Sequence, residues 1–196
     1  MPPVSESGGR SRMNIYFLDY PITYTGEQLR PHWILKTTNI TGDALVAFHG
    51  PCQVKTEALV DLHDQANKAF IYSESMVHLI GEWFQSDLET TVLKQRLLVA
   101  TVGEIIREKS NYVPRRRGND LYIDNRKLTV SVATISPVST LLHLGINISD
   151  KNTPVPAIGL ENLRICQFEI TNLLLERFKK ECEDIAISRA KVRSVV

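Results

Sequence analysis

The sequence predicts an α+β fold in which a mixed, mainly antiparallel sheet is flanked by helices. Two observations lead to this prediction. Apolar residues recur at helical spacing over 73–85, 88–109 and 167–190. Residues 112–149, by contrast, have the composition and turn spacing of consecutive strands. Strands joined by short turns pair antiparallel, and amphipathic helices then cover the sheet.

The composition favours a folded chain over a disordered one. The chain has 196 residues, of which 43% are hydrophobic, and this is enough to bury a real core. Residues 1–12 are rich in Ser, Gly, Pro and Arg, so we expect them to form a flexible tail. We expect residues 13–196 to form a single domain.

Charge and cysteine content argue against several classes of function. The formal net charge is +1, so no overall field attracts nucleic acid or anionic lipid, and nucleic-acid binding is disfavoured. Three cysteines without a CxxC pair argue against a disulfide framework or a zinc ribbon and fit a reducing cytoplasm. Apolar runs are shorter than the roughly 20 residues that span a bilayer, and the N-terminus lacks a signal peptide's apolar centre. The sequence therefore predicts a cytoplasmic protein without membrane contact, which binds through a local site.

The first part of the chain predicts short elements. Residues 14–19 and 21–25 are typical of two short strands. A short helix is expected from apolar residues at helical spacing, namely Leu29, Trp33 and Ile34.

A buried strand is predicted at 44–48, ALVAF, by its β-branched and aromatic residues. We expect this strand to break into a loop at 49–53, HGPCQ, and a further strand to follow at 54–62. The next segment, 73–85, is predicted to be an amphipathic helix from the spacing of its apolar residues, namely Met76, Leu79, Ile80, Trp83 and Phe84.

The second part of the chain predicts a long core helix, a β block and a closing helix. Ser86 and Asp87 can cap the helix at 88–109. Turns at 124–125 and at Pro137 separate the strands of the β block. The closing helix is expected within 163–193, with a buried side made of Phe168, Ile170, Leu173, Leu174, Phe178 and Ile185.

Residues 118–149, GNDLYIDNRKLTVSVATISPVSTLLHLGINIS, resemble the biotin/lipoate protein ligase family. The matching motifs are Asn119-Asp120 before an apolar strand, Arg126-Lys127-Leu128 at the start of the next strand, and Gly145-Ile146-Asn147-Ile148 at the end of a later one. HGPCQ at 49–53 is similar to the HGPGQ element of the octanoyl transferases in the same superfamily. The whole sequence is similar still more closely to the archaeal and bacterial family called domain of unknown function 366. The resemblance implies a class II synthetase-like fold and leaves the function open.

The resemblance implies that Lys127 lies in a ligand pocket. These ligases activate a carboxylic acid by attack on the α-phosphate of ATP, so a cation must neutralise charge on phosphate and carboxylate oxygens. The resemblance gives Lys127 this role. From its local sequence alone, a lysine after a two-residue turn is typical of a solvated strand edge. Lys127→Ala is therefore expected to change the free energy of unfolding by no more than about 0.5 kcal/mol.

Asn119 and Asp120 are the candidate residues for the nucleotide. By the resemblance, they orient the phosphates of ATP or a Mg²⁺ ion, which prefers carboxylate and phosphate oxygens. Asp120 is then the candidate metal ligand. The alternative is that both residues only cap a turn or a strand.

Arg117, Gly118 and Gly145 are further candidate ligand-binding residues. Three consecutive arginines, 115–117, precede Gly118 and could bind a triphosphate through bidentate hydrogen bonds. A solvated run of charge is the alternative. Gly145 would let a ligand approach the backbone closely.

His49 and Cys52 are candidate catalytic residues because a loop that follows a strand often faces a pocket. A Cys near a His acts as a nucleophile when its pKa is lowered, and a buried structural cysteine is the alternative. The family match places Lys127, Asn119 and His49 around one ligand. We therefore expect these three side chains to line one cavity.

Two functions from different classes follow. The first is a ligase or acyltransferase-like enzyme that binds a small carboxylic acid or its acyl-adenylate and uses ATP, with Lys127 as the electrophilic group. The second is a catalytically silent protein that binds a nucleotide or acyl ligand, or a scaffold that forms a homodimer through its sheet. Residues 116–118 replace the Lys-Trp-Pro of biotin ligases, which favours the second function. Residues 156–159 replace the Pro-Cys-Gly of octanoyl transferases, which argues against their chemistry.

Overall fold

The structure is a computed structural model that describes residues 13–67, 70–84 and 87–195. The tail expected at 1–12 lies outside these residues, as does Ser86. Within the described residues the strands form a five-stranded sheet in the order β1-β2-β3-β8-β7 and a three-stranded sheet in the order β4-β5-β6. The strands are β1 (Asn14–Phe17), β2 (Ala44–Val54), β3 (Ile71–Trp83), β4 (Arg115–Arg117), β5 (Asp120–Ile123), β6 (Arg126–Lys127), β7 (Thr129–Ile135) and β8 (Thr140–Asn147).

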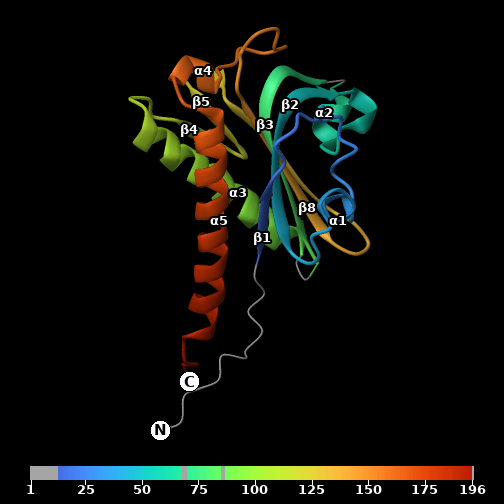
Figure 1. Ribbon diagram of the computed structural model, residues 1–196, viewed down its shortest axis with the longest axis vertical. Coiled ribbons are helices and arrows are strands. Elements are labelled where there is room, and N and C mark those ends of the chain that lie inside the picture. The colour runs from blue at the N-terminus through green and yellow to red at the C-terminus, as the bar shows by residue number, and fades with distance from the viewer. Residues whose placement is uncertain (1–12, 68–69, 85–86, 196) are drawn as a thin grey trace.

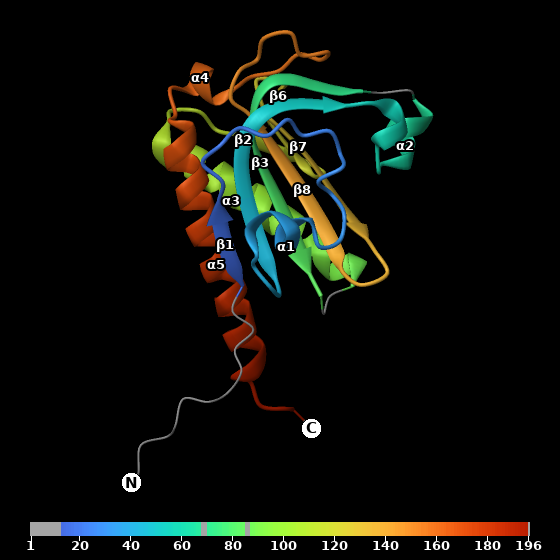
Figure 2. The same ribbon diagram turned by 45° about the vertical axis from the view of Figure 1, so that its right-hand side comes forward.

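The sheet is mixed and mainly antiparallel, as predicted. β1 runs parallel to β2, and the other paired strands run antiparallel. The long helices α3 (Leu88–Lys109) and α5 (Gln167–Ala190) cover one face of the large sheet (Figure 1). The short helices α1 (Trp33–Thr38) and α2 (Leu62–Ala66) lie on the other side (Figure 2). Two further short elements are η1 (Thr56–Ala58) and α4 (Leu160–Leu163).

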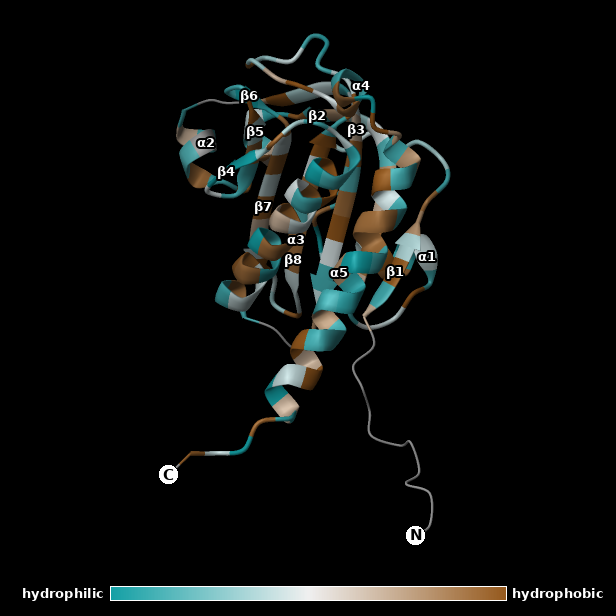
Figure 3. Ribbon diagram, turned by 90° about the vertical axis from the view of Figure 1, so that its left-hand side faces the viewer, coloured by the Kyte–Doolittle hydropathy of each residue, from teal (hydrophilic) through white to brown (hydrophobic). Residues whose placement is uncertain are grey.

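Strand alternation divides the buried residues between the two faces of the large sheet. Figure 3 shows α3 and α5 in front of strongly hydrophobic strands. The strand residues that pack toward these helices include Leu45, Ala47, Val77, Leu79, Leu142, Leu144 and Ile146. The residues on the opposite face include Ala44, Val46, Phe48, Met76 and Ile80, which pack with Tyr24 and Ile34. The opposite face is the one that carries the site described below.

The helix predicted at 73–85 is wrong, because this segment forms β3. β3 lies between β2 and β8, and every residue from 76 to 83 is buried. A strand covered on both faces carries apolar residues at nearly every position, so its periodicity does not distinguish it from a buried helix. The helical spacing of the apolar residues is a consequence of this continuous burial.

The loop predicted at 49–53 is also wrong, because β2 continues through HGPCQ to Val54. A register shift between Gly50 and Cys52 marks a bulge, and Pro51 is tolerated there because it has no N–H to donate. Two neighbouring predictions fail as well. Residues 54–62 contain η1 and the start of α2 instead of a strand, and the strand expected at 21–25 is reduced to a bridge between Tyr24 and Cys52.

The helix at 88–109 and the turn at 124–125 are confirmed. Asp87 caps α3, and its Oδ1 accepts a hydrogen bond from the backbone N–H of Thr90 at 2.7 Å. Asp124 and Asn125 have φ angles of 49° and 63°, which suit the two-residue turns that match strand twist. Ahead of that turn lies β5, and after it lie β6 and β7.

The closing helix is confirmed as α5. Its expected buried side is correct for Ile170, Leu174 and Phe178 and wrong for Phe168 and Ile185, which are about half exposed. Among the helices of the described residues, none combines the length and hydrophobicity needed to cross a lipid bilayer.

Candidate functional site

A cavity of about 410 Å³ lies on the face of the large sheet opposite α3 and α5. Its walls come from β3, β7 and β8, from the segment between β2 and α2, and from the loop after β8. Its apolar lining includes Val54, Leu59, Met76, Val130 and Val155. Its polar lining includes Tyr24, Asn119, Asp120, Lys127, His143 and Asn147.

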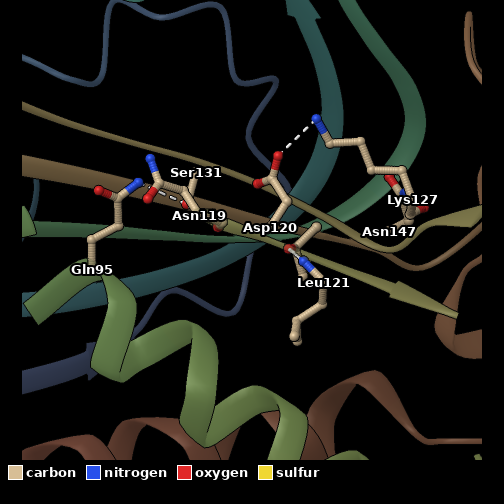
Figure 4. A network of polar contacts seen from close by, with 8 residues as sticks. Gln95, Asn119, Asp120, Leu121, Lys127, Ser131 and Asn147 are labelled. Atoms are coloured by element: carbon tan, nitrogen blue, oxygen red, sulfur yellow. Dashed lines mark hydrogen bonds and ion pairs between the residues drawn. The ribbon is translucent and has the colours of Figure 1, made fainter. Parts of the chain in front are cut away.

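Lys127 and Asp120 form an ion pair at the wall of this cavity. The Nζ of Lys127 lies 2.8 Å from the Oδ2 of Asp120, and the two side chains are 27% and 18% exposed (Figure 4). The hairpin between β5 and β6 brings the two residues together across its tight turn. The lysine is therefore held in place at the cavity and is not a solvated edge charge.

The backbone of Lys127 is fixed by three hydrogen bonds. Its N–H donates to the carbonyl of Pro156 at 2.9 Å, and its carbonyl accepts from the N–H of Ile158 at 3.1 Å and from the Nδ2 of Asn147 at 3.1 Å. These bonds connect β6 to the loop after β8 and to β8 itself. A side chain that starts from such a fixed backbone can position its charge precisely.

Asn119 lies beside the ion pair and is connected to α3 through its backbone. Its carbonyl accepts from the Oγ of Ser131 at 2.6 Å, and that hydroxyl oxygen accepts from the Nε2 of Gln95 at 2.8 Å (Figure 4). The side-chain Oδ1 of Asn119 is buried and accepts no hydrogen bond from the described residues. A buried acceptor at a cavity wall is a place where a ligand's N–H or O–H can donate.

His49 does not share this cavity, so that prediction is wrong. Alternation along β2 directs His49 toward α5, where its Nε2 lies 3.0 Å from the Oγ1 of Thr171 and its ring contacts Phe17 and Phe168. Burial on that face lowers the pKa of His49. The extra residue of the bulge lies on β3, so the alternation of β2 is unbroken and His49 stays on the face opposite Phe48 and Cys52.

Cys52 is a core residue. It is completely buried in the apolar cluster around Phe48 and Tyr24, and burial raises the pKa of its thiol to about 12. A nucleophilic cysteine needs the opposite shift, because the thiolate is the reactive form. The structure therefore supports the structural alternative for Cys52.

This assignment predicts how the cysteines react with iodoacetamide. We expect Cys166, which is exposed, to be alkylated in the native protein at neutral pH, and Cys52 to react at least roughly 100-fold more slowly. Mass spectrometry of digests taken over time measures both rates, and the protein unfolded in urea serves as the control in which both residues react. Comparable native rates would make Cys52 an accessible thiolate.

Arg117 and Gly118 lie outside the cavity. The guanidinium of Arg117 lies 5.0 Å from the centroid of the Tyr122 ring and donates to the Oδ1 of Asn125. Gly118 has a φ of 60° and forms the exposed turn between β4 and β5. The prediction that these residues bind the same ligand as Lys127 has no support in their placement.

Gly145 contributes to the floor of the cavity by having no side chain. A Cβ at this position would lie 2.7 Å from the Cε of Met76 and 3.1 Å from the Cγ2 of Val130, and both of those residues line the cavity. A larger residue would push these side chains into the space above. That a ligand approaches the backbone near Gly145 stays a prediction.

Three residues on the cavity face were not predicted from the sequence as site residues. His143 and Tyr24 line the cavity with their rings stacked 3.8 Å apart at 14°, and His78 lies below them. The Nδ1 of His78 is 3.1 Å from the Nε2 of His143. Burial lowers the pKa of His78 to about 3 and that of His143 well below 6.5. The sequence signal that could have identified His78 and His143 is that each is a histidine within an otherwise apolar strand.

The fold defines the class of structures that this chain resembles. Biotin protein ligase from Aquifex aeolicus, in complex with biotin and ATP, matches with a TM-score of 0.58 and 15% identity over 85% of this chain and 69% of that one. A bipartite lipoate protein ligase from Thermoplasma acidophilum matches with a TM-score of 0.58 and 12% identity over 87% of this chain and 84% of that one. The chain has the catalytic fold of the biotin and lipoate protein ligases.

Within this class, the chain belongs to the family described as domain of unknown function DUF366, whose match covers residues 13–193. An uncharacterised protein from Methanocaldococcus jannaschii is 38% identical over 91% of this chain and 79% of its own length. A protein of unknown function from Pyrococcus horikoshi matches with a TM-score of 0.88 and 35% identity over 94% of this chain and all of that one. The predicted family and the predicted fold are both confirmed.

Proposed function

We propose that the cavity binds a small carboxylic acid or its acyl-adenylate, with the ammonium of Lys127 beside the carboxylate or phosphate oxygens. The observation that carries this proposal is the ion pair of Lys127 with Asp120 at the cavity wall. Asp120 holds the ammonium in place, and a partly buried cation attracts an entering oxyanion more strongly than a solvated one does. The protein in the similar Aquifex structure binds biotin, a carboxylic acid, together with ATP.

The rest of the cavity suits an acyl group. Val54, Leu59, Met76 and Val130 provide apolar walls, and Gly145 leaves room at the floor. Such a mixed pocket, apolar with a few fixed polar groups, is typical of small-molecule sites. The carboxyl end would then lie toward β6, and the acyl chain would lie across β7, β8 and β3.

We propose ATP as the co-substrate and Mg²⁺ as its counter-ion. Among the described residues, no cluster of three or more His, Cys, Asp or Glu side chains could hold a metal ion. Asp120 therefore offers one carboxylate, and phosphate oxygens and water would complete the octahedral shell that Mg²⁺ requires. The magnesium ion would supply charge neutralisation on the phosphates, while Lys127 binds the carboxyl end.

A second candidate is a silent binding protein with the same cavity. The placement of Arg117 favours it, because this guanidinium contacts Tyr122 and Asn125 outside the cavity instead of facing a triphosphate. Both candidates bind the same acyl ligand. They differ in whether ATP is cleaved.

ATP-dependent release of pyrophosphate tests the proposal and separates the two candidates. The purified chain is assayed with Mg²⁺-ATP and a panel of octanoate, lipoate and biotin, and Lys127→Ala is the control variant. An enzyme releases pyrophosphate with one of these acids, and Lys127→Ala reduces the rate at least roughly tenfold. A silent protein releases none but binds the acid or an adenylate analogue through Lys127. An absence of both release and binding would refute the proposal.

A further inference from the structure

The tautomers of His78 and His143 are determined by their hydrogen bonds. The Nε2 of His78 lies 3.3 Å from the carbonyl oxygen of Gly50, which can only accept, so this nitrogen carries the proton. His78 is buried and neutral, so its Nδ1 must accept. The Nε2 of His143, 3.1 Å away, therefore donates to it. Because His143 is also neutral, its own Nδ1 carries no proton and is a hydrogen-bond acceptor.

This acceptor belongs to a residue that lines the cavity. His143 is 3% exposed, and its Nδ1 receives no hydrogen bond from the described residues. Tyr24 stacks on the imidazole ring, and Phe48 stacks on that of His78 at 5.0 Å. Both rings are therefore fixed in plane, so the direction of the acceptor is fixed as well.

The acceptor lies at the opposite end of the site from Lys127. Asn147, whose Nδ2 bonds to the carbonyl of Lys127, and His143 both lie on β8, four residues apart and on the same face. At about 3.3 Å per residue, their Cα atoms are roughly 13 Å apart. Apolar side chains of Met76 and Val130 lie between the two ends. A ligand whose carboxylate meets Lys127 can therefore reach His143 only with the far end of its acyl group.

We propose that the acid recognised by this cavity carries a neutral hydrogen-bond donor, a hydroxyl or an amide N–H, at the end remote from its carboxyl group, and that the Nδ1 of His143 accepts from it. This inference rests on the proposed function for the position of the carboxyl end. A plain alkyl chain would cover this nitrogen without bonding to it, and an unpaired buried acceptor costs free energy. The site would therefore bind such an acid more tightly than a simple fatty acid of the same length.

Matched acids test this selection in the wild-type chain. Octanoic acid and its ω-hydroxy and ω-methoxy derivatives share the carboxylate and the chain, and of the two ω-substituents only the hydroxyl can donate. We expect calorimetry to show the hydroxy acid binding about tenfold more tightly than the methoxy acid, as one hydrogen bond to a buried acceptor predicts.

Two variants assign the preference to His143. His143→Phe keeps an aromatic ring against Tyr24 and removes the acceptor, so the hydroxy and methoxy acids should bind equally. Tyr24→Phe removes the other polar group of the stack and should retain the tenfold preference. Because His143→Phe also deprives His78 of its donor, nitrogen NMR of the wild type provides an independent test. The Nδ1 resonance of His143 should be that of an unprotonated nitrogen and should shift with the hydroxy acid but not with the methoxy acid.

The outcomes separate this inference from the proposed function. Equal binding of the hydroxy and methoxy acids to the wild type, with both weakened by Lys127→Ala, would overturn the donor requirement and leave the carboxylate site intact. A hydroxy preference in Lys127→Ala whose affinity for both acids equals that of the wild type would support His143 and contradict the role of Lys127. Failure of all three acids to bind would overturn both.

Discussion

Lys127→Ala is expected to weaken binding of octanoyl-sulfamoyl-adenosine, a non-hydrolysable acyl-adenylate, by about 2–3 kcal/mol. This is the range for a hydrogen bond to a charged group in a partly buried site. Lys127→Arg should also weaken binding. A planar guanidinium that pairs with Asp120 would not place its N–H donors where the ammonium of Lys127 lies. Calorimetric titration of the three proteins measures both losses.

A second lysine is the matched control. Lys109 forms an ion pair with Glu169 between α3 and α5, far from the cavity lining, so Lys109→Ala should bind the analogue as the wild type does.

Thermal melts should show Lys127→Ala destabilised by about 1 kcal/mol, because its pair with Asp120 is partly buried. This exceeds the change expected for a solvated lysine. Equal binding by Lys127→Ala and the wild type would make Lys127 structural.

Gly50→Ala is expected to lower the free energy of unfolding by about 3 kcal/mol or more. A Cβ at Gly50 would lie 2.1 Å from the carbonyl oxygen of Ile22 and 2.7 Å from its carbonyl carbon. Both contacts are with backbone, so relief requires the chain around Ile22 to move away from β2. Hydrogen bonds from Ile22 to His49 and from Tyr24 to Pro51 would then lengthen or break. Urea unfolding followed by circular dichroism measures the loss.

Gly103→Ala provides the control for this prediction. In the middle of α3, a Cβ at Gly103 would lie no closer than 3.6 Å to the Cδ2 of Leu121, which is an ordinary contact. Replacing a helical glycine with alanine should then stabilise the protein by about 1 kcal/mol. If Gly50→Ala were as stable as the wild type, the glycine of HGPCQ would have a role other than this close backbone approach.

The parts of the fold that the sequence predicted are those with local signals. The helix at 88–109 has a capping Asp87 and a wide apolar face, and the turn at Asp124 and Asn125 has residues that adopt positive φ. β3 was misassigned because both of its faces are buried, so its sequence lacks the alternation that identifies a strand. One of its two neighbours in the sheet, β8, is also remote in the sequence.

The site residues that were predicted correctly are likewise those that lie close together in the sequence. Asn119, Asp120 and Lys127 lie within one hairpin, so a family motif places them together, and the structure shows all three at one cavity. The prediction for His49 failed because β2 continues through HGPCQ instead of ending in a loop, and strand alternation then directs this side chain toward α5. The contact between His78 and His143 depends on the register of β3 with β8, which join segments 65 residues apart. No local pattern encodes that register.

A crystal structure of the protein with octanoyl-sulfamoyl-adenosine is the most direct test of whether Lys127 binds the ligand in this cavity. We expect the sulfamate oxygens to lie within hydrogen-bond distance of the Nζ of Lys127, and the acyl chain to lie over Gly145 between Met76 and Val130. A complex in which the analogue occupies another surface would contradict the proposed function. So would a complex in which Lys127 stays paired with Asp120 and does not contact the analogue.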